Sequence, residues 1–99
     1  MKMFKDLKFK KRGIGGVGAS HTFENGITIS VQAGIGNYST PKKDLKSPND
    51  YVSFEVGLWG EGGDWVTKDF IPDANDDVVG WQDRGEINTL MLLIQSTKS

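Results

Sequence analysis

The sequence predicts an α+β fold, with an antiparallel sheet of about four strands and one C-terminal amphipathic helix packed on its apolar face. Apolar and polar residues alternate over 26–34 and again over 51–59, which is typical of half-buried strands. Near the end of the chain, apolar residues follow the spacing of one helical face, at Ile87, Leu90, Met91 and Ile94. Strands followed by a helix within 99 residues indicate a single domain spanning residues 1–99.

The first strand pair is predicted from a turn. Asn25-Gly26 supplies the positive φ angles of a tight hairpin, so 19–23 is expected to run antiparallel to 26–34. The second strand then has one apolar face, made of Ile27, Ile29, Val31 and Ala33.

The segment 51–59 is the next predicted strand. Its expected buried face holds Val52, Phe54, Val56 and Leu58, and its other face holds Tyr51, Ser53, Glu55 and Trp59. The Gly-rich turn 60–63 follows, so 64–67 is expected to form a short fourth strand. Residues 78–81 are a brief apolar return, in which Trp81 is expected to seal the core under the helix.

The C-terminal helix is expected over 83–97. Asp83 is a good N-cap, and Glu86 stands three residues later, as in a capping box. Leu92 and Leu93 widen the apolar stripe beyond what one sheet face covers. Two interpretations are open: the helix is buried on two sides, or it meets a second copy in a homodimer.

Composition restricts the protein class. The chain has no cysteine, so neither disulfides nor thiolate-bound zinc are expected, which suits a reducing cytoplasm. It has no apolar run of the roughly 20 residues that a membrane span needs, and its start lacks the apolar core of a secretory signal. We therefore expect a cytoplasmic protein without a membrane partner.

Charge is divided between the two halves of the chain. Residues 1–46 hold nine Lys/Arg against three Asp/Glu, whereas residues 47–99 hold three against ten. The halves either attract each other within the fold or give the surface a basic end and an acidic end that steer charged partners.

The basic, Gly-rich segment 1–18 has two interpretations. It is an edge strand or arm kept soluble by lysine, or it contacts single-stranded nucleic acid through cations interleaved with aromatic residues. In the second case the long loop 34–50 contributes as well, and the anion-binding residues are Lys8, Lys10, Lys11, Arg12, Lys42, Lys43 and Lys46.

Gly13, Gly15 and Gly18 match the glycine spacing of a nucleotide-binding loop. That loop needs a buried strand before it and a helix after it, and neither fits here. We expect a twisted edge segment instead. The nucleotide alternative is an anion site made by backbone N–H groups of 13–18 beside Lys11 and Arg12.

Catalytic and metal motifs are incomplete. His21 is the single histidine, and its sequence neighbours Ser20 and Thr22 point to the opposite face of a strand. Glu55 is expected to serve as a cross-strand partner. Asp73-x-Asn75-x-Asp77 begins like a calcium loop, but Val78 and Arg84 stand where that loop needs glycine and glutamate. We therefore predict a non-enzyme with no metal and no cofactor.

An acidic, aromatic surface is the predicted partner-binding site. Trp59 and Trp65 flank a turn that carries Glu61 and Asp64, and tryptophan is enriched at binding hot spots. The acidic loop adds Asp73, Asp76 and Asp77. In the alternative interpretation both indole rings pack inward.

Several segments together resemble small uncharacterised proteins carried by bacteriophages. They are Phe23-Glu24-Asn25-Gly26-x-Thr28-Ile29-Ser30-Val31-Gln32, Phe54-Glu55-Val56, Asp77-Val78-x-Gly80-Trp81 and the terminal helix, across about residues 20–95. The resemblance implies a phage accessory protein in a bacterial cytoplasm that acts by binding a host protein, for instance as an inhibitor of a host defence complex.

Overall fold

The computed structural model describes residues 1–97, which form five strands and four short or long helical segments. The strands are β1 (Lys10–Lys11), β2 (Val17–Thr22), β3 (Thr28–Ala33), β4 (Ser53–Trp59) and β5 (Val78–Asp83). The helical segments are the 3₁₀ turns η1 (Phe4–Asp6) and η2 (Pro48–Asp50) and the helices α1 (Thr67–Phe70) and α2 (Arg84–Ser96).

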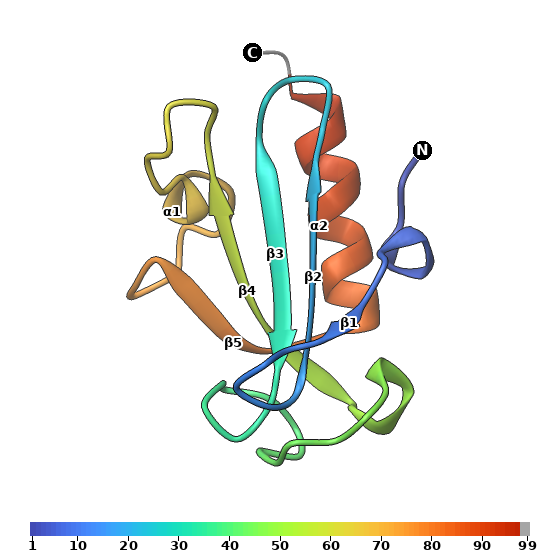
Figure 1. The fold of residues 1–99 in the computed structure, drawn as a ribbon. Helices are drawn as coiled ribbons and strands as arrows, with labels where there is room; N and C mark the ends of the chain where they lie inside the picture. The colour runs from blue at the N-terminus through green and yellow to red at the C-terminus, as the bar shows by residue number, and fades with distance from the viewer. Residues whose placement is uncertain (98–99) are drawn as a thin grey trace.

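The strands form one antiparallel sheet in the order β1-β2-β3-β4-β5, so each strand pairs with its neighbours in sequence. Helix α2 lies behind this sheet in Figure 1, and no helix formed by residues 1–97 lies over the opposite face. The α+β prediction is therefore confirmed, with a C-terminal helix on one face of the sheet. Within the described residues, no helix is long and apolar enough to cross a membrane.

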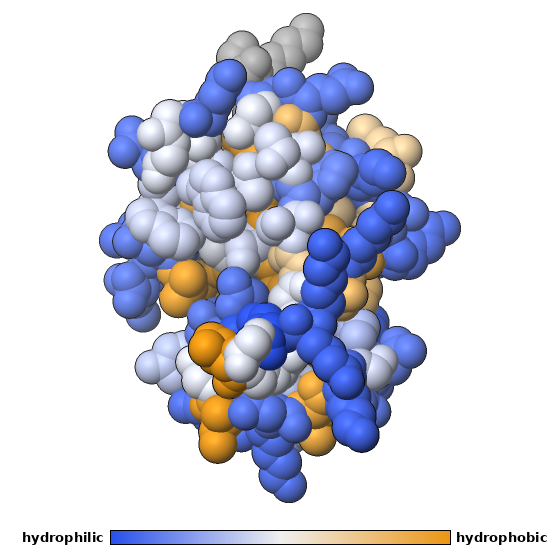
Figure 2. All heavy atoms as spheres, viewed as in Figure 1, coloured by the Kyte–Doolittle hydropathy of each residue, from blue (hydrophilic) through white to orange (hydrophobic). Residues whose placement is uncertain are grey.

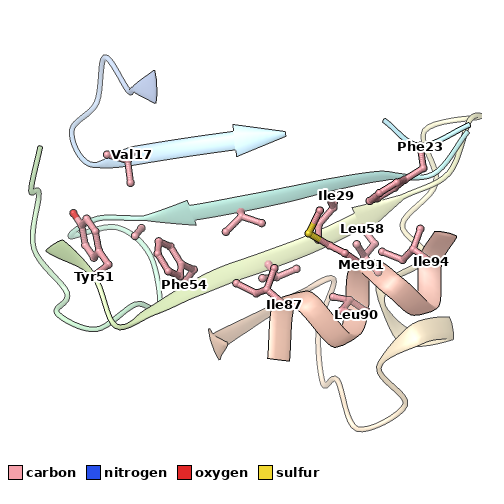
Figure 3. Packing of buried hydrophobic residues seen from close by; sticks show 13 residues of the cluster. Val17, Phe23, Ile29, Tyr51, Phe54, Leu58, Ile87, Leu90, Met91 and Ile94 are labelled. Carbon is pink, nitrogen blue, oxygen red and sulfur yellow. The ribbon is translucent and has the colours of Figure 1, made fainter. Parts of the chain in front are cut away.

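The core lies between the sheet and α2. Figure 3 shows Ile29 and Leu58 pointing from the strands towards Met91 and Ile94 of the helix. The predicted helical stripe is confirmed, because Ile87, Leu90, Met91 and Ile94 are all buried. Burial of each such side chain contributes about 1.5–3 kcal/mol to stability.

The N-terminus of α2 is capped as predicted. The Asp83 carboxylate accepts a hydrogen bond from Glu86 N–H at 2.8 Å, and Glu86 Oε1 accepts one from Asp83 N–H at 3.0 Å. Leu92 and Leu93 are 38% and 47% exposed, so the chain itself buries the helix on one side only.

The predicted inward and outward faces are wrong for the first two residues of the expected strand 51–59. Tyr51 is buried, whereas Val52 is 65% exposed. The reason is that β4 begins only at Ser53, after the 3₁₀ turn η2, so alternation does not extend back to Val52. The Tyr51 hydroxyl donates to Lys43 O and accepts from Leu45 N–H, which ties the loop 34–50 to the core.

The predicted fourth strand at 64–67 was also wrong. A single bridge joins Trp65 to Trp59, and the chain then turns into α1 at Thr67. The buried Thr67 hydroxyl bonds the backbone of Leu58, which turns the chain away from the sheet. On its other side from β3, β4 pairs with β5, which contains the apolar segment 78–81.

The basic N-terminal segment contributes both an edge strand and core. Lys10 and Lys11 pair with Gly18 and Val17 of β2. Upstream, Phe4 and Phe9 stack around the buried Phe54 at ring centroid distances of 5.1 and 5.6 Å. These aromatic contacts hold the lysines beside the sheet.

Candidate functional site

The uncovered face of the sheet is lined by alternate strand residues. Phe54, Val56 and Leu58 of β4 point to the core, so Glu55, Gly57 and Trp59 point to the other face. Figure 2 views the molecule from this uncovered side. The surface in this view mixes hydrophilic residues with several separate hydrophobic ones.

A groove of about 500 Å³ crosses part of this face. Cations line one side of it, hydrogen-bonding side chains line its floor, and one indole closes it. The lining residues are Lys8, Lys10, Lys11, Arg12, Gly18, Ala19, Ser20, Ser30, Gln32 and Trp59. The first four anion-binding residues expected from the sequence therefore lie together, beside an aromatic ring.

Arg12 is fixed in place at the groove. Its Nε donates to Gly15 O at 2.9 Å, and its Nη1 donates to Gln32 Oε1 at 2.6 Å. Both partners are neutral, but the Asp44 carboxylate lies near the guanidinium, since a Cβ at Gly34 would contact both Arg12 Nη2 and Asp44 Oδ1. The hydrogen bonds hold this cation in one orientation at the edge of the groove.

The glycine-rich segment forms the hairpin turn between β1 and β2, and it is followed by a strand rather than by the helix of a nucleotide-binding loop. Gly15 and Gly16 have φ angles of 102° and 73°, which only glycine adopts readily. Gly15 N–H donates to Arg12 O, so this donor closes the turn and is not directed at an anion.

The second group of predicted cations lies apart from the groove. Lys42, Lys43 and Lys46 are exposed in the loop 34–50 and do not line it. Lys42 Nζ lies 4.9 Å from the centroid of the Tyr38 ring, which is a cation–π contact.

The acidic, aromatic surface forms around the turn after β4. Trp59 and Trp65 pack edge to face with ring centroids 5.7 Å apart, and Trp65 is 49% exposed. A Cβ at Gly57 would lie 2.9 Å from the Trp65 ring and 3.3 Å from Val78. The turn and the start of β5 therefore meet on the uncovered face, over Gly57.

The predicted acidic side chains differ in exposure and in what they contact. Glu61 lies against Gly26 in the β2–β3 turn. Asp64, Asp73 and Asp76 are exposed, and Asp77 is half-buried. The structure thus brings the predicted acidic residues to the end and the edge of the sheet that lie away from β1.

The sequence did not predict the exposed aromatic pair formed by Tyr38 and Trp81. Trp81 was expected to seal the core, but it is 59% exposed and its ring stacks on Tyr38 at a centroid distance of 5.1 Å. Its φ of 54° lies in the left-handed region, next to an irregularity in the β4–β5 pairing. Hydropathy indicates burial for an indole and carries no signal for this backbone conformation.

Glu55 has a positioning role that differs from the expected cross-strand pairing. Its carboxylate accepts hydrogen bonds from Asn37 Nδ2 at 3.1 Å and from Tyr38 N–H at 3.0 Å. It therefore fastens the loop that carries Tyr38 onto the uncovered face.

His21 lines a separate hollow of about 880 Å³ between the N-terminus, the β2–β3 turn and the end of α2. Its ring packs edge to face on Phe23 at 4.8 Å. No three metal-ligating side chains gather anywhere in the described part of the chain. The His21 ring thus contributes packing against Phe23.

Comparison of the chain with protein-family models, with curated proteins and with solved structures found no significant match.

Proposed function

We propose that the protein is a non-enzymatic binding protein and that it takes single-stranded nucleic acid on the uncovered face of its sheet. The observation that carries the proposal is the groove, which four basic residues line together with Trp59, Ser20, Ser30 and Gln32.

Each part of the groove suits one part of a nucleotide. Lysine and arginine attract phosphates over long range and release counterions on binding. An indole ring stacks on any unpaired base, because every base has a π-face. Serine hydroxyls and a glutamine amide both donate and accept hydrogen bonds, which suits base edges and sugars.

The shape of the site favours a single strand over a duplex. Trp59 lies at the end of β4 on a sheet face, and a base reaches it only after leaving its own stack. No helix lies over this face to enter a major groove of DNA, which is how many duplex readers act.

The salt dependence of single lysine variants tests this proposal. For Lys10→Gln, we expect weaker binding to an oligothymidine and a slope of log affinity against log salt that is smaller by about 0.7. Lys68→Gln, which removes an exposed lysine of α1, is the matched control and keeps the slope of the original protein. Equal slopes for both variants would contradict phosphate binding in the groove.

A second candidate function uses the acidic, aromatic surface. The exposed Trp65, paired with Trp59 and preceded in the chain by the exposed Asp64, suits a basic surface on a partner protein. The resemblance to small phage proteins supports a host protein as that partner, in the bacterial cytoplasm, with inhibition of a defence complex as the outcome.

Affinity capture from a bacterial lysate, with and without nuclease, separates the two candidates. The protein-binding function predicts one partner that survives nuclease and is lost on charge reversal of Glu61, Asp64, Asp76 and Asp77. Recovery of nucleic acid, or partners lost on nuclease treatment, supports the groove instead.

A further inference from the structure

Tyr38 and Trp81 are two exposed aromatic rings that touch each other. They are 49% and 59% exposed, with a 39° angle between the ring planes. They come from different parts of the chain, since Tyr38 lies in the loop after β3 and Trp81 lies in β5. Large exposed rings are costly in water, so such a pair calls for an explanation.

Several contacts hold the pair in one arrangement. Trp81 N–H donates to Tyr38 O at 2.8 Å, and the Glu55 carboxylate accepts from Tyr38 N–H. Glu55 also holds Asn37, which is only 7% exposed. A Cβ at Gly80 would overlap the Cβ of Tyr38, so only glycine lets the loop approach β5 this closely.

The backbone at Trp81 also adopts an unusual conformation, with a φ of 54°. A positive φ is an outlier for a bulky residue, and it persists only where the surrounding structure holds it. It follows the irregular pairing between Phe54 and Val56, and such irregularities re-aim side chains next to functional sites. Here the result is an indole turned out of the core and onto Tyr38.

The pair does not line the groove, but it lies on the same face of the sheet. Gln32, on the floor of the groove, is directly opposite Glu55, which carries the Tyr38 loop. On β5, Val78 is two residues before Gly80 and is paired with Gly57 of β4, so all three positions are on the uncovered face. Lys42 lies over the Tyr38 ring and places a cation beside the pair.

We propose that Tyr38 and Trp81 form a second base-stacking platform for the strand held in the groove. This inference rests on the proposed nucleic-acid function and extends its site from the β1 edge to β5. One base stacks on Trp59 and a later base stacks on the Tyr38–Trp81 pair. The phosphates between them lie near Arg12 and Lys42.

Substitution of Trp81 by glycine tests the platform without a threat to folding. Glycine adopts a φ of 54° without strain, so Trp81→Gly removes the ring and relieves the backbone. Trp81→Phe keeps an aromatic ring and is the matched control. Binding of a labelled oligothymidine of about 12 nucleotides is followed by fluorescence anisotropy over a series of salt concentrations.

We expect Trp81→Gly to weaken binding by about 5- to 150-fold, the range for loss of one stacked base, with Trp81→Phe close to the original protein. The salt slope stays unchanged, because no phosphate contact is lost.

The contrary results are distinct. If Trp81→Gly binds as tightly as the original protein, or changes the salt slope, the platform is overturned while the groove stands. If the original protein binds no oligothymidine at low salt, the proposed function fails together with the platform.

Discussion

At the residue scale, side chains on the uncovered face are placed by glycines as much as by their own chemistry. Gly57 leaves room for the Trp65 ring, and Gly80 leaves room for Tyr38. Sequence periodicity identifies neither contact, because each joins a glycine in a strand to an aromatic residue in a different part of the chain. The aromatic residues were visible in the sequence, but their exposure was decided by these tertiary contacts.

Gly57→Ala tests the placement of Trp65. The added methyl group would lie 2.9 Å from the indole, so we expect the free energy of unfolding to fall by about 1–3 kcal/mol. Gly62→Ala is the control, since nothing lies within 4 Å of the position of its Cβ, and we expect a change within about 0.5 kcal/mol. Urea unfolding measures both, and equal stability of the two variants would place Trp65 elsewhere.

At the element scale, the sequence predicted those strands and helices that are determined by residues within their own segment. The hairpin between β2 and β3, the alternation of β3 and the capped, striped helix α2 all formed, although of Asn25 and Gly26 only Gly26 takes the expected positive φ. The misplaced elements depend on distant partners: Tyr51 is buried through the loop at Lys43, and 64–67 is turned from the sheet by Thr67. Local patterning holds no information about such contacts.

The capping box of α2 gives a direct prediction. Asp83→Ala leaves Glu86 N–H without its acceptor, so we expect a loss of about 0.5–2 kcal/mol in unfolding free energy. Asp83→Asn keeps an acceptor oxygen and should lose much less. The same denaturant titration measures both variants, and a stable Asp83→Ala protein would contradict the role of this cap.

At the scale of the whole molecule, the divided charge of the chain becomes a division in space. The lysines of β1 lie at one edge of the sheet, while the acidic loop 73–77 leads into β5 at the other. The separation is partial, because Lys42 lies over Tyr38 beside Trp81 of β5.

The exposed part of α2 bears on assembly. Leu92 and Leu93 lie on the side of the helix away from the core, and we propose that they join two copies in a homodimer. Light scattering at high protein concentration should then show twice the chain mass, falling to the single-chain mass for Leu93→Lys. A monomer at every concentration would remove this proposal.

The central claim is that the uncovered sheet face binds single-stranded nucleic acid, and a competition titration tests it most directly. A labelled oligothymidine is bound at about 50 mM salt and displaced by an unlabelled single strand or by duplex DNA of the same length. We predict that the single strand competes more strongly and that affinity falls steeply as salt rises. No binding at low salt, or equal competition by duplex, would contradict the account.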